Sequence, residues 1–223
     1  MATRDHPVFA RLFAGLSPLL ERAGLARVRA RLLADLHGTV IEIGAGSGAS
    51  FPHYPVAVER VLAVEPADFL RRRARRRAEI AAPEVSIVGA VAEQLPFADA
   101  SLDGAVSALT WCSVDSPQAS LAELARVLVD DAPLVFVEHV RASHPWTAKV
   151  QQMLDRRVWP AVAGGCHLAR DTPSMLADAG FALDWHSPVG RRGPSAWSLA
   201  PHVWGVARRR PRAALTTSGG PRR

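Results

Sequence analysis

The stretch Glu42-Ile43-Gly44-Ala45-Gly46-Ser47-Gly48 decides the fold of this 223-residue chain. It overlaps the end of a mostly apolar segment, residues 39–43, that has the length of a short buried strand. Glycines at such a turn adopt positive φ and let a ligand approach the backbone without a Cβ clash. The next apolar segment, residues 61–64, ends at Glu65. A carboxylate there can accept hydrogen bonds from both hydroxyls of a ribose, so the sequence predicts a nucleoside-binding turn.

Two classes of cofactor share this arrangement. A dinucleotide fold requires Gly-x-Gly-x-x-Gly/Ala, and Gly44, Gly46 and Ala49 satisfy that pattern. A fold for S-adenosylmethionine (SAM) places an acidic residue two positions before Gly-x-Gly-x-Gly, and Glu42 with the three loop glycines satisfies that pattern as well. The loop alone leaves a dinucleotide oxidoreductase and a SAM-binding protein open.

Strands and helices alternate along the rest of the chain. Further strands are expected at residues 85–88, 102–109, 134–140, 181–186 and 197–208, and helices at 8–36, 67–82, 118–128, 145–163 and 173–179. Such alternation predicts βαβ units and a parallel sheet that is covered on both faces. We therefore expect a Rossmann-like α/β fold, with a seven-stranded, mostly parallel sheet and helices on both faces.

Three regions are expected from this pattern. Residues 1–37 form N-terminal helices that can serve as a lid, residues 38–208 form the cofactor-binding domain, and residues 209–223 form a disordered, arginine-rich tail.

The chain has 27 Lys+Arg against 21 Asp+Glu, a net charge of +6. Six arginines and no acidic residue lie in the last sixteen positions, so the body carries 21 basic against 21 acidic side chains. A neutral body argues against a nucleic-acid partner.

The two cysteines, Cys112 and Cys166, cannot build a disulfide framework, and their spacing is not that of a zinc site. We expect small buried residues at both positions and no bound metal. No apolar run approaches the length of a membrane span, and Arg4, Asp5 and Arg11 interrupt any signal peptide. A cytoplasmic protein is expected, and its oligomeric state stays open.

Two later motifs separate the cofactor classes. Ala92-Glu93-Gln94-Leu95-Pro96-Phe97 follows the strand at 85–88, and Ser101-Leu102-Asp103 begins the next strand. With the glycine loop ahead of them, they resemble the class I SAM-dependent methyltransferases over roughly residues 38–140. The resemblance implies SAM as cofactor and S-adenosylhomocysteine as product. It also implies a set of cofactor-binding residues: Glu42, Gly44, Ala45, Gly46, Gly48, Glu65, Pro66, Ala92, Glu93 and Leu109.

A second group of segments extends the resemblance to about Arg208. These segments are residues 109–114, 138–140, 154–159, 164–170 and 201–205. They resemble the subgroup that contains the mammalian methyltransferase-like alkyl-thiol methyltransferases and actinobacterial relatives. That resemblance implies a small-molecule acceptor, a thiol first. The arginine-rich composition suggests an actinobacterial source, for which we expect a secondary metabolite or a detoxified thiol as the acceptor.

The residues themselves suggest how such an acceptor is handled. His139 is the candidate base, because it ends the strand at 134–140, at the edge of the sheet where ligands bind. His167 is a second catalytic candidate, and Asp155 is expected to orient a histidine or bind substrate. Candidate substrate-binding residues are Trp111, Trp159, Arg170 and His202.

Two alternatives stay open at this point. One is an O- or N-methyltransferase of a small molecule or lipid amine. The other is a non-catalytic SAM-binding or nucleic-acid-associated protein. Residues 110–113 read Thr-Trp-Cys-Ser, where nucleobase-amine enzymes often have Asn/Asp-Pro-Pro-Tyr/Phe, and this argues against a nucleobase acceptor.

Overall fold

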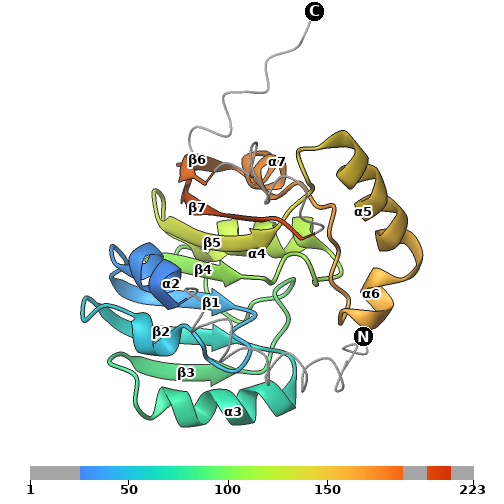
Figure 1. Ribbon diagram of the computed structural model, residues 1–223. Coiled ribbons are helices and arrows are strands. Elements are labelled where there is room, and N and C mark those ends of the chain that lie inside the picture. Colours follow the sequence, from blue (N-terminus) through green and yellow to red (C-terminus); the bar gives the residue numbers. More distant parts are fainter. Residues whose placement is uncertain (1–25, 188–199, 212–223) are drawn as a thin grey trace, which may run out of the picture.

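The computed structural model of the chain describes residues 26–187 and 200–211. Strands and helices alternate through these residues, as the sequence predicts (Figure 1). The strands are β1 (Gly38–Ile43), β2 (Val58–Val64), β3 (Glu84–Val88), β4 (Gly104–Ala108), β5 (Pro133–His139), β6 (Phe181–His186) and β7 (His202–Arg209). The helices are α2 (Ala26–Leu33), the short 3₁₀ helix η2 (Phe51–His53), α3 (Asp68–Ala78), α4 (Pro117–Val127), α5 (Pro145–Arg157), α6 (Trp159–Val162) and α7 (Thr172–Asp178).

The described strands form one seven-stranded sheet in the order β3-β2-β1-β4-β5-β7-β6. Neighbours from β3 to β5 run parallel, whereas β7 runs antiparallel to both β5 and β6. This confirms the Rossmann-like, mostly parallel sheet. The chain order reverses between β1 and β4, and in open α/β sheets ligands bind beyond the carboxyl ends of the strands at such a point. The glycine loop, which follows β1, lies there.

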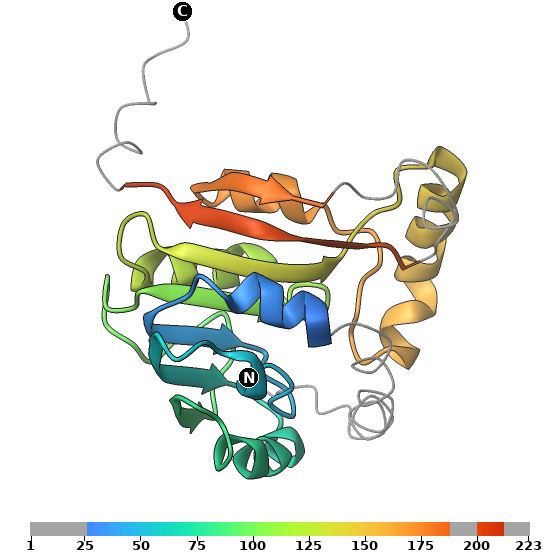
Figure 2. The ribbon, with the colours of Figure 1, turned by 60° about the vertical axis from the view of Figure 1, so that its left-hand side comes forward.

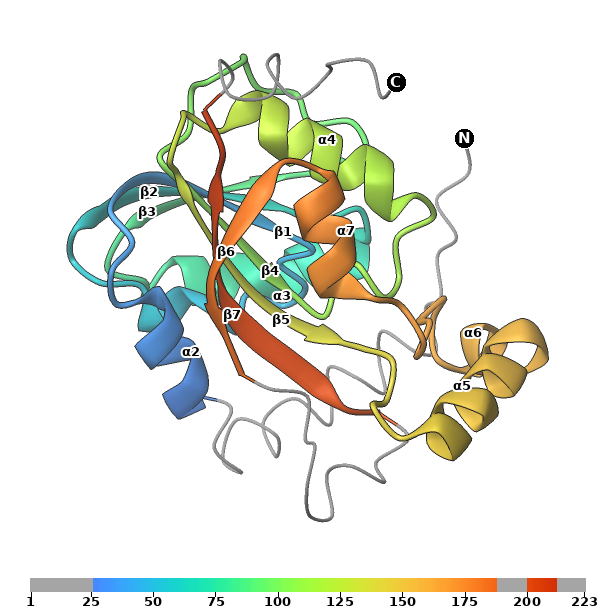
Figure 3. The same cartoon turned by 90° about the horizontal axis from the view of Figure 1, so that it is seen from above.

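Helices cover both faces of the sheet. On one face, α2 and α3 contribute Leu33 and Ala74 to an apolar core. On the other face, α4 and α7 contribute Leu121, Leu124 and Leu176 to a second core. Figure 2 shows α2 lying against the sheet, and Figure 3 shows it on the opposite side from α4 and α7. The sheet therefore lies between two apolar layers.

Helix α4 illustrates how local sequence determines these elements. The Ser116 hydroxyl accepts a hydrogen bond from the Ala119 amide at 3.2 Å, and Pro117 occupies the first turn. Both are favoured at a helix start, because a side-chain acceptor satisfies an otherwise free amide and proline needs none. Leu121 and Leu124 lie three residues apart and are fully buried, and each contributes about 1.5–3 kcal/mol of burial free energy.

The carboxyl ends of β4 and β5 meet beside α5 and α6 (Figure 1). Strand β7 extends this edge, because its first residue, His202, pairs with the last residue of β5, His139. Segments from four parts of the chain therefore converge on one end of the sheet.

Several boundaries differ from the sequence expectations, and three of the differences lie in the C-terminal part of the domain. The helix expected over 145–163 is divided, since α5 ends at Arg157 and α6 begins at Trp159. Pro160 lacks the amide hydrogen that a continuous helix needs at that point. The last strand begins at His202 rather than at 197, and residues 197–199 lie outside the described residues. It continues to Arg209, whose buried side chain donates to the Ala125 carbonyl, so the structured domain passes the expected boundary at 208.

The expected N-terminal lid lies mostly outside the described residues. Of the helical region 8–36, the structure describes α2, whose Arg29 donates to the Ser50 hydroxyl at 3.0 Å. The lid and the tail beyond residue 211 therefore stay predictions. Within the part of the chain that the structure describes, no helix is both long and apolar enough to cross a membrane.

Candidate active site

The glycine loop has the backbone that its sequence predicts. Gly44, Gly46 and Gly48 have φ values of 61°, 57° and 76°. A Cβ at Gly44 would lie 2.3 Å from the Thr110 hydroxyl, and one at Gly48 would lie 2.5 Å from the Phe51 ring. A Cβ at Gly46 would meet nothing closer than 3.9 Å. Gly44 and Gly48 are thus required by packing, whereas Gly46 borders the open space that a ligand can enter.

Glu65 ties this loop to the end of β2. Its two carboxylate oxygens accept hydrogen bonds from the amides of Gly46 at 2.9 Å and Ala67 at 2.8 Å. These two hydrogen bonds hold the carboxylate beside the loop, and its contacts to the ribose hydroxyls stay a prediction. The side chain is held in place before any ligand arrives.

Glu42 lies beneath the loop in a buried polar group. It accepts a hydrogen bond from the Tyr54 hydroxyl at 2.9 Å. Burial raises the pKa of Glu42, and hydrogen bonding to Ser50 and the charge of Arg29 partly oppose that shift. Its contacts are with protein groups that support the loop, and a direct cofactor contact stays a prediction.

The other predicted cofactor residues border the same region. Ala45 donates its amide to the Val64 carbonyl at 3.0 Å, and Ala92 is buried. Glu93 accepts a hydrogen bond from the Ser116 amide at 3.2 Å. The Pro66 carbonyl accepts one from Arg71. Leu109 has a φ of 59°, a conformation that costs a non-glycine residue free energy and that clusters at functional sites.

Three potential metal-ligating or nucleophilic side chains meet where β4 and β5 end. They are Cys112, in the turn after β4, His139, the last residue of β5, and Cys166, in the segment after α6. Their ligand atoms all lie within 4.8 Å of one another, and Cys166 Sγ is 3.5 Å from His139 Nδ1. Both cysteines are buried and free of a disulfide. We call these three residues the Cys-His cluster.

The two thiols of the cluster differ in acidity. Hydrogen bonding to Cys166 and burial raise the pKa of the Cys112 thiol well above its ordinary value. The same hydrogen bond lowers the pKa of Cys166, although burial opposes that effect. Cys166 is consequently the thiol more readily converted to a thiolate.

Glu138 supports the turn that carries Cys112. Its side chain is fully buried, and one oxygen accepts hydrogen bonds from the Ser107 hydroxyl at 2.7 Å and the amides of Thr110 and Trp111 at 3.0 and 3.2 Å. The other oxygen is buried and finds no hydrogen-bond partner among the described residues. Burial raises the pKa of this carboxyl group.

Asp155 and Arg170 hold the segment after α6 against the same turn. The Asp155 carboxylate accepts hydrogen bonds from the amides of Leu168 at 2.7 Å and Ala169 at 2.9 Å. The Arg170 guanidinium donates to the carbonyls of Trp111 and Val114. Both charged groups thus bond to backbone groups, and we infer that they hold the segment after α6 in position at the site. The substrate contacts predicted for them stay untested.

His167 lies beside this support. Its amide donates to the Cys112 carbonyl at 2.6 Å, and its Nδ1 is 4.0 Å from the Asp155 carboxylate. Burial and the nearby Arg170 charge lower the pKa of His167, whereas Asp155 opposes them. This separation is longer than a hydrogen bond, so the orientation of a histidine by Asp155 stays a prediction.

The two predicted tryptophans occupy different environments. Trp111 is fully buried in the main core, where its indole N–H donates to the Ser120 hydroxyl at 3.2 Å. Trp159 packs against Cys112, Ala163 and Cys166. Trp159 therefore borders the Cys-His cluster directly, while the Trp111 side chain lies beneath it.

His202 stacks beside the cluster, with its ring centroid 4.3 Å from that of His139. Burial and the neighbouring His139 lower the pKa of His202 to about 4. A histidine whose pKa is lower in the folded state binds fewer protons there than in the unfolded state, where the pKa is about 6.5. We expect the free energy of unfolding to fall as the pH drops from about 6.5 to about 4.

Urea unfolding across that pH window measures this effect. A His202→Gln variant should lose part of the pH dependence, and a variant of the exposed His37 should keep it. An unchanged pH dependence in the His202 variant would assign the effect to other groups.

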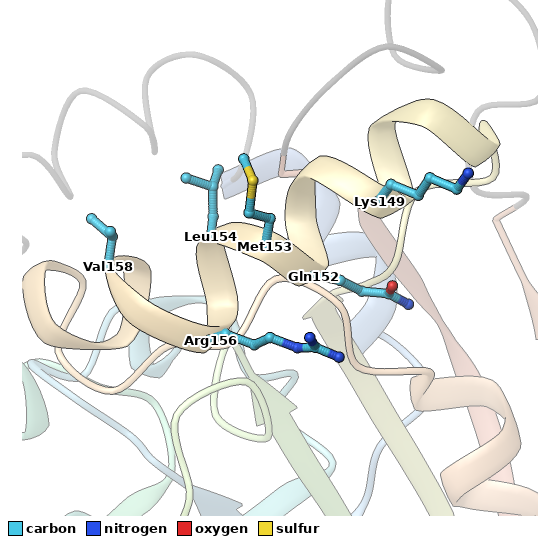
Figure 4. Close-up of a pocket in the computed structure, with 6 residues that line it drawn as sticks. All are labelled: Lys149, Gln152, Met153, Leu154, Arg156 and Val158. Atoms are coloured by element: carbon cyan, nitrogen blue, oxygen red, sulfur yellow. The ribbon is translucent and has the colours of Figure 1, made fainter.

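A surface hollow lies apart from this site. Residues of α5 and its C-terminal end line it: Lys149, Gln152, Met153, Leu154, Arg156 and Val158 (Figure 4). None of the predicted site residues is among them. Asp155 lies on the same helix but is not among these residues, and its carboxylate bonds the Leu168 amide.

The sequence predicted most of the residues described here but gave no role to the sulfur groups or to Glu138. Cys112 and Cys166 were expected to be small buried residues without a bound metal, and both are buried. The signal lay in the segments 109–114, 138–140 and 164–170, each of which contributes one member of the cluster. These three segments lie close together because of the order of the strands in the sheet. The spacing of residues along the sequence does not reveal that order.

Comparisons with known proteins support this description. Residues 41–136 match the family model of a methyltransferase domain. Thiol S-methyltransferase TMT1B of Rattus norvegicus is 33% identical over 186 residues, which cover 78% of this chain and 73% of that protein. Thiol S-methyltransferase TMT1A of Homo sapiens is 31% identical over 175 residues, which cover 76% and 70%.

Solved structures agree on the fold. Geranyl diphosphate C-methyltransferase from Streptomyces coelicolor A3(2) aligns with a TM-score of 0.65 at 14% identity, over 93% of this chain and 86% of that one. The YcgJ protein of Bacillus subtilis aligns with a TM-score of 0.66 at 15% identity, over 85% and 99%. The family match and the glycine loop identify SAM as the cofactor. The chain belongs to the class I SAM-dependent methyltransferases.

Proposed function

We propose that the protein transfers the methyl group of SAM to the sulfur of a small, apolar thiol. The observation that carries this proposal is the similarity, over more than three quarters of the chain, to enzymes named as thiol S-methyltransferases. The site is compatible with such an acceptor, since Leu109, Trp159 and Ala163 give it an apolar lining.

The transfer is an in-line displacement. The acceptor sulfur forms a bond to the methyl carbon, the bond from that carbon to the sulfonium sulfur breaks, and its electron pair stays on S-adenosylhomocysteine. The enzyme must align the two sulfurs and exclude water. The Thr110 side chain lies where a Cβ at Gly44 would be, so the cofactor loop directly adjoins the turn that carries Cys112.

A thiol acceptor must also lose its proton. Free thiols have a pKa of about 8.5, so they are mostly protonated at neutral pH, and the thiolate is the nucleophile. His139, at the end of β5, is the residue predicted to accept the proton. It lies beside Cys166 and His202, and Trp159 packs against the group that contains Cys166.

A panel of acceptors tests this function. The protein is incubated with SAM and alkyl thiols, aryl thiols, phenols or amines, and methylated products are identified by mass spectrometry. We expect S-methyl products from the thiols, with the more apolar members preferred. Turnover of phenols or amines without any S-methyl product would refute the thiol assignment and favour an O- or N-methyltransferase.

A further inference from the structure

The Cys-His cluster has the composition of a soft-metal site. Two thiols and an imidazole come from three separate segments, at Cys112, His139 and Cys166. Both thiols are buried, whereas His139 is partly exposed. Thiolate and imidazole are the ligands that zinc prefers, and Cys₂His is a known catalytic zinc set.

The distances suit a tetrahedral ion. Zinc–sulfur bonds of about 2.3 Å and zinc–nitrogen bonds of about 2.0–2.1 Å place neighbouring ligand atoms roughly 3.5–3.8 Å apart. The Cys166 Sγ to His139 Nδ1 distance is 3.5 Å, and no pair of ligand atoms in the cluster exceeds 4.8 Å. Small side-chain movements therefore bring all three atoms into bonding range of one ion.

The surroundings hold the ligands in place, as metal sites require. Glu138 fixes the turn before Cys112 through the amides of Thr110 and Trp111. Arg170 binds two carbonyls of the same turn. Asp155 bonds the amides two and three residues after Cys166. The Glu138 carboxyl group lies close to the thiols, and one of its oxygens has no partner among the described residues.

Three protein ligands leave one position of a tetrahedral ion open. Catalytic zinc sites keep such a position for water or substrate, whereas structural sites fill all four. Leu109 and Trp159 border the cluster and offer apolar surface beside that position. We propose that Cys112, His139 and Cys166 bind a zinc ion whose open position takes the sulfur of the acceptor thiol. This inference rests on the proposed thiol methylation.

The ion supplies the activation that a thiol needs. A thiol that coordinates zinc is deprotonated, and its proton passes to solvent. With Cys112 and Cys166 as thiolates, the ion and its protein ligands have no net charge, so the bound acceptor thiolate makes the group anionic. That charge attracts the cationic sulfonium of SAM. The sulfur lone pair then forms the bond to the methyl carbon, the sulfonium takes the other electron pair, and the neutral thioether dissociates.

This assignment changes the role of His139. As a zinc ligand through Nδ1, it positions and activates the acceptor through the ion, and it does not accept the proton itself. A direct base and a zinc ligand both predict lost turnover on substitution of His139. Metal content is the measurement that distinguishes them.

The full chain, purified under reducing conditions and incubated with zinc, is dialysed and analysed for metal by mass spectrometry. We expect about one zinc ion per chain. The Cys112→Ala and Cys166→Ala variants should each bind zinc more than about 100-fold more weakly, which exceeds the loss from a supporting residue. A His37→Ala variant is the matched control, because His37 is exposed at the opposite end of β1. Binding of S-adenosylhomocysteine by each variant reports that it is folded.

Cobalt substitution tests the open position independently of activity. Tetrahedral cobalt with thiolate ligands absorbs strongly in the visible range, and its spectrum depends on its ligands. We expect the spectrum of the cobalt-loaded chain to change when an alkyl thiol is added and to stay unchanged with the corresponding alcohol.

The outcomes separate this inference from the proposed function. Thiol methylation at full rate by protein that binds no zinc would overturn the metal site and leave the function standing, with His139 as base. Zinc retained by both cysteine variants would also overturn it, since the ion would lie elsewhere. If the protein binds one zinc ion per chain but gives no S-methyl product from any thiol, the proposed function is refuted. The proposal that the open zinc position takes the acceptor thiol is then refuted as well.

Discussion

Replacing His139 with alanine is expected to lower thiol turnover by about two to four orders of magnitude, the usual contribution of a general base, and turnover is also expected to fall if His139 activates the acceptor as a zinc ligand. His139 ends β5 and lies 3.5 Å from Cys166, at the edge where the acceptor is expected. Binding of S-adenosylhomocysteine should stay nearly intact, because the glycine loop and Glu65 are held by other contacts. Single-turnover kinetics and calorimetry measure the two quantities separately.

The matched control for this variant is His37→Ala, at an exposed position before β1. It should retain both turnover and cofactor binding. Near-normal turnover in the His139 variant would remove this residue from the chemical step. A parallel loss of cofactor binding would instead indicate that the edge of the sheet has been disturbed.

Replacing Glu65 with alanine is expected to weaken SAM binding by about 100-fold or more. The change removes the acceptor for the Gly46 and Ala67 amides, which lie 2.9 and 2.8 Å from it, and the predicted contacts to the ribose hydroxyls. Each hydrogen bond to a charged group contributes about 1.5–3 kcal/mol, and 1.4 kcal/mol corresponds to a factor of ten, so two such bonds account for that loss.

Calorimetric titration with SAM measures this effect. Glu59→Ala, at an exposed position on the same strand, removes an equal charge and should change the affinity little. The Glu65 variant should also lose discrimination between SAM and its 2′-deoxy analogue. Retained discrimination would show that the ribose is bound by other residues.

The cofactor half of the site was predictable because its signals are local. Residues 42–48 contain the acid and the three glycines, and Glu65 follows at the end of the next strand. Gly44, Gly46 and Gly48 have positive φ, a backbone conformation that glycine adopts readily because it lacks a Cβ atom. Apolar runs and their alternation with helical segments likewise predicted the seven-stranded sheet, since each strand carries its own pattern.

The acceptor half was predicted less completely. The sequence placed His139 at the edge of the sheet, yet it assigned Trp111 to substrate, and the structure buries that ring in the core. Asp155 was expected to orient a histidine or bind substrate, and Arg170 to bind substrate. In the structure their charged groups bond to backbone amides and carbonyls, and the predicted roles stay untested. A side chain's partners depend on segments that are distant in sequence, so residue type alone does not predict them.

By itself, the sequence predicted the alternation of strands and helices and the glycine turn, because periodicity and short-range spacing are properties of consecutive residues, and its motifs indicated the family. The tertiary structure alone brought Cys112, His139 and Cys166 within 4.8 Å of one another. These residues lie on a turn, a strand end and a loop whose proximity follows from β4 and β5 being adjacent and from the segment after α6 folding back over them. Burial and hydrogen bonding within that junction, which no local pattern encodes, give the two cysteines different acidities.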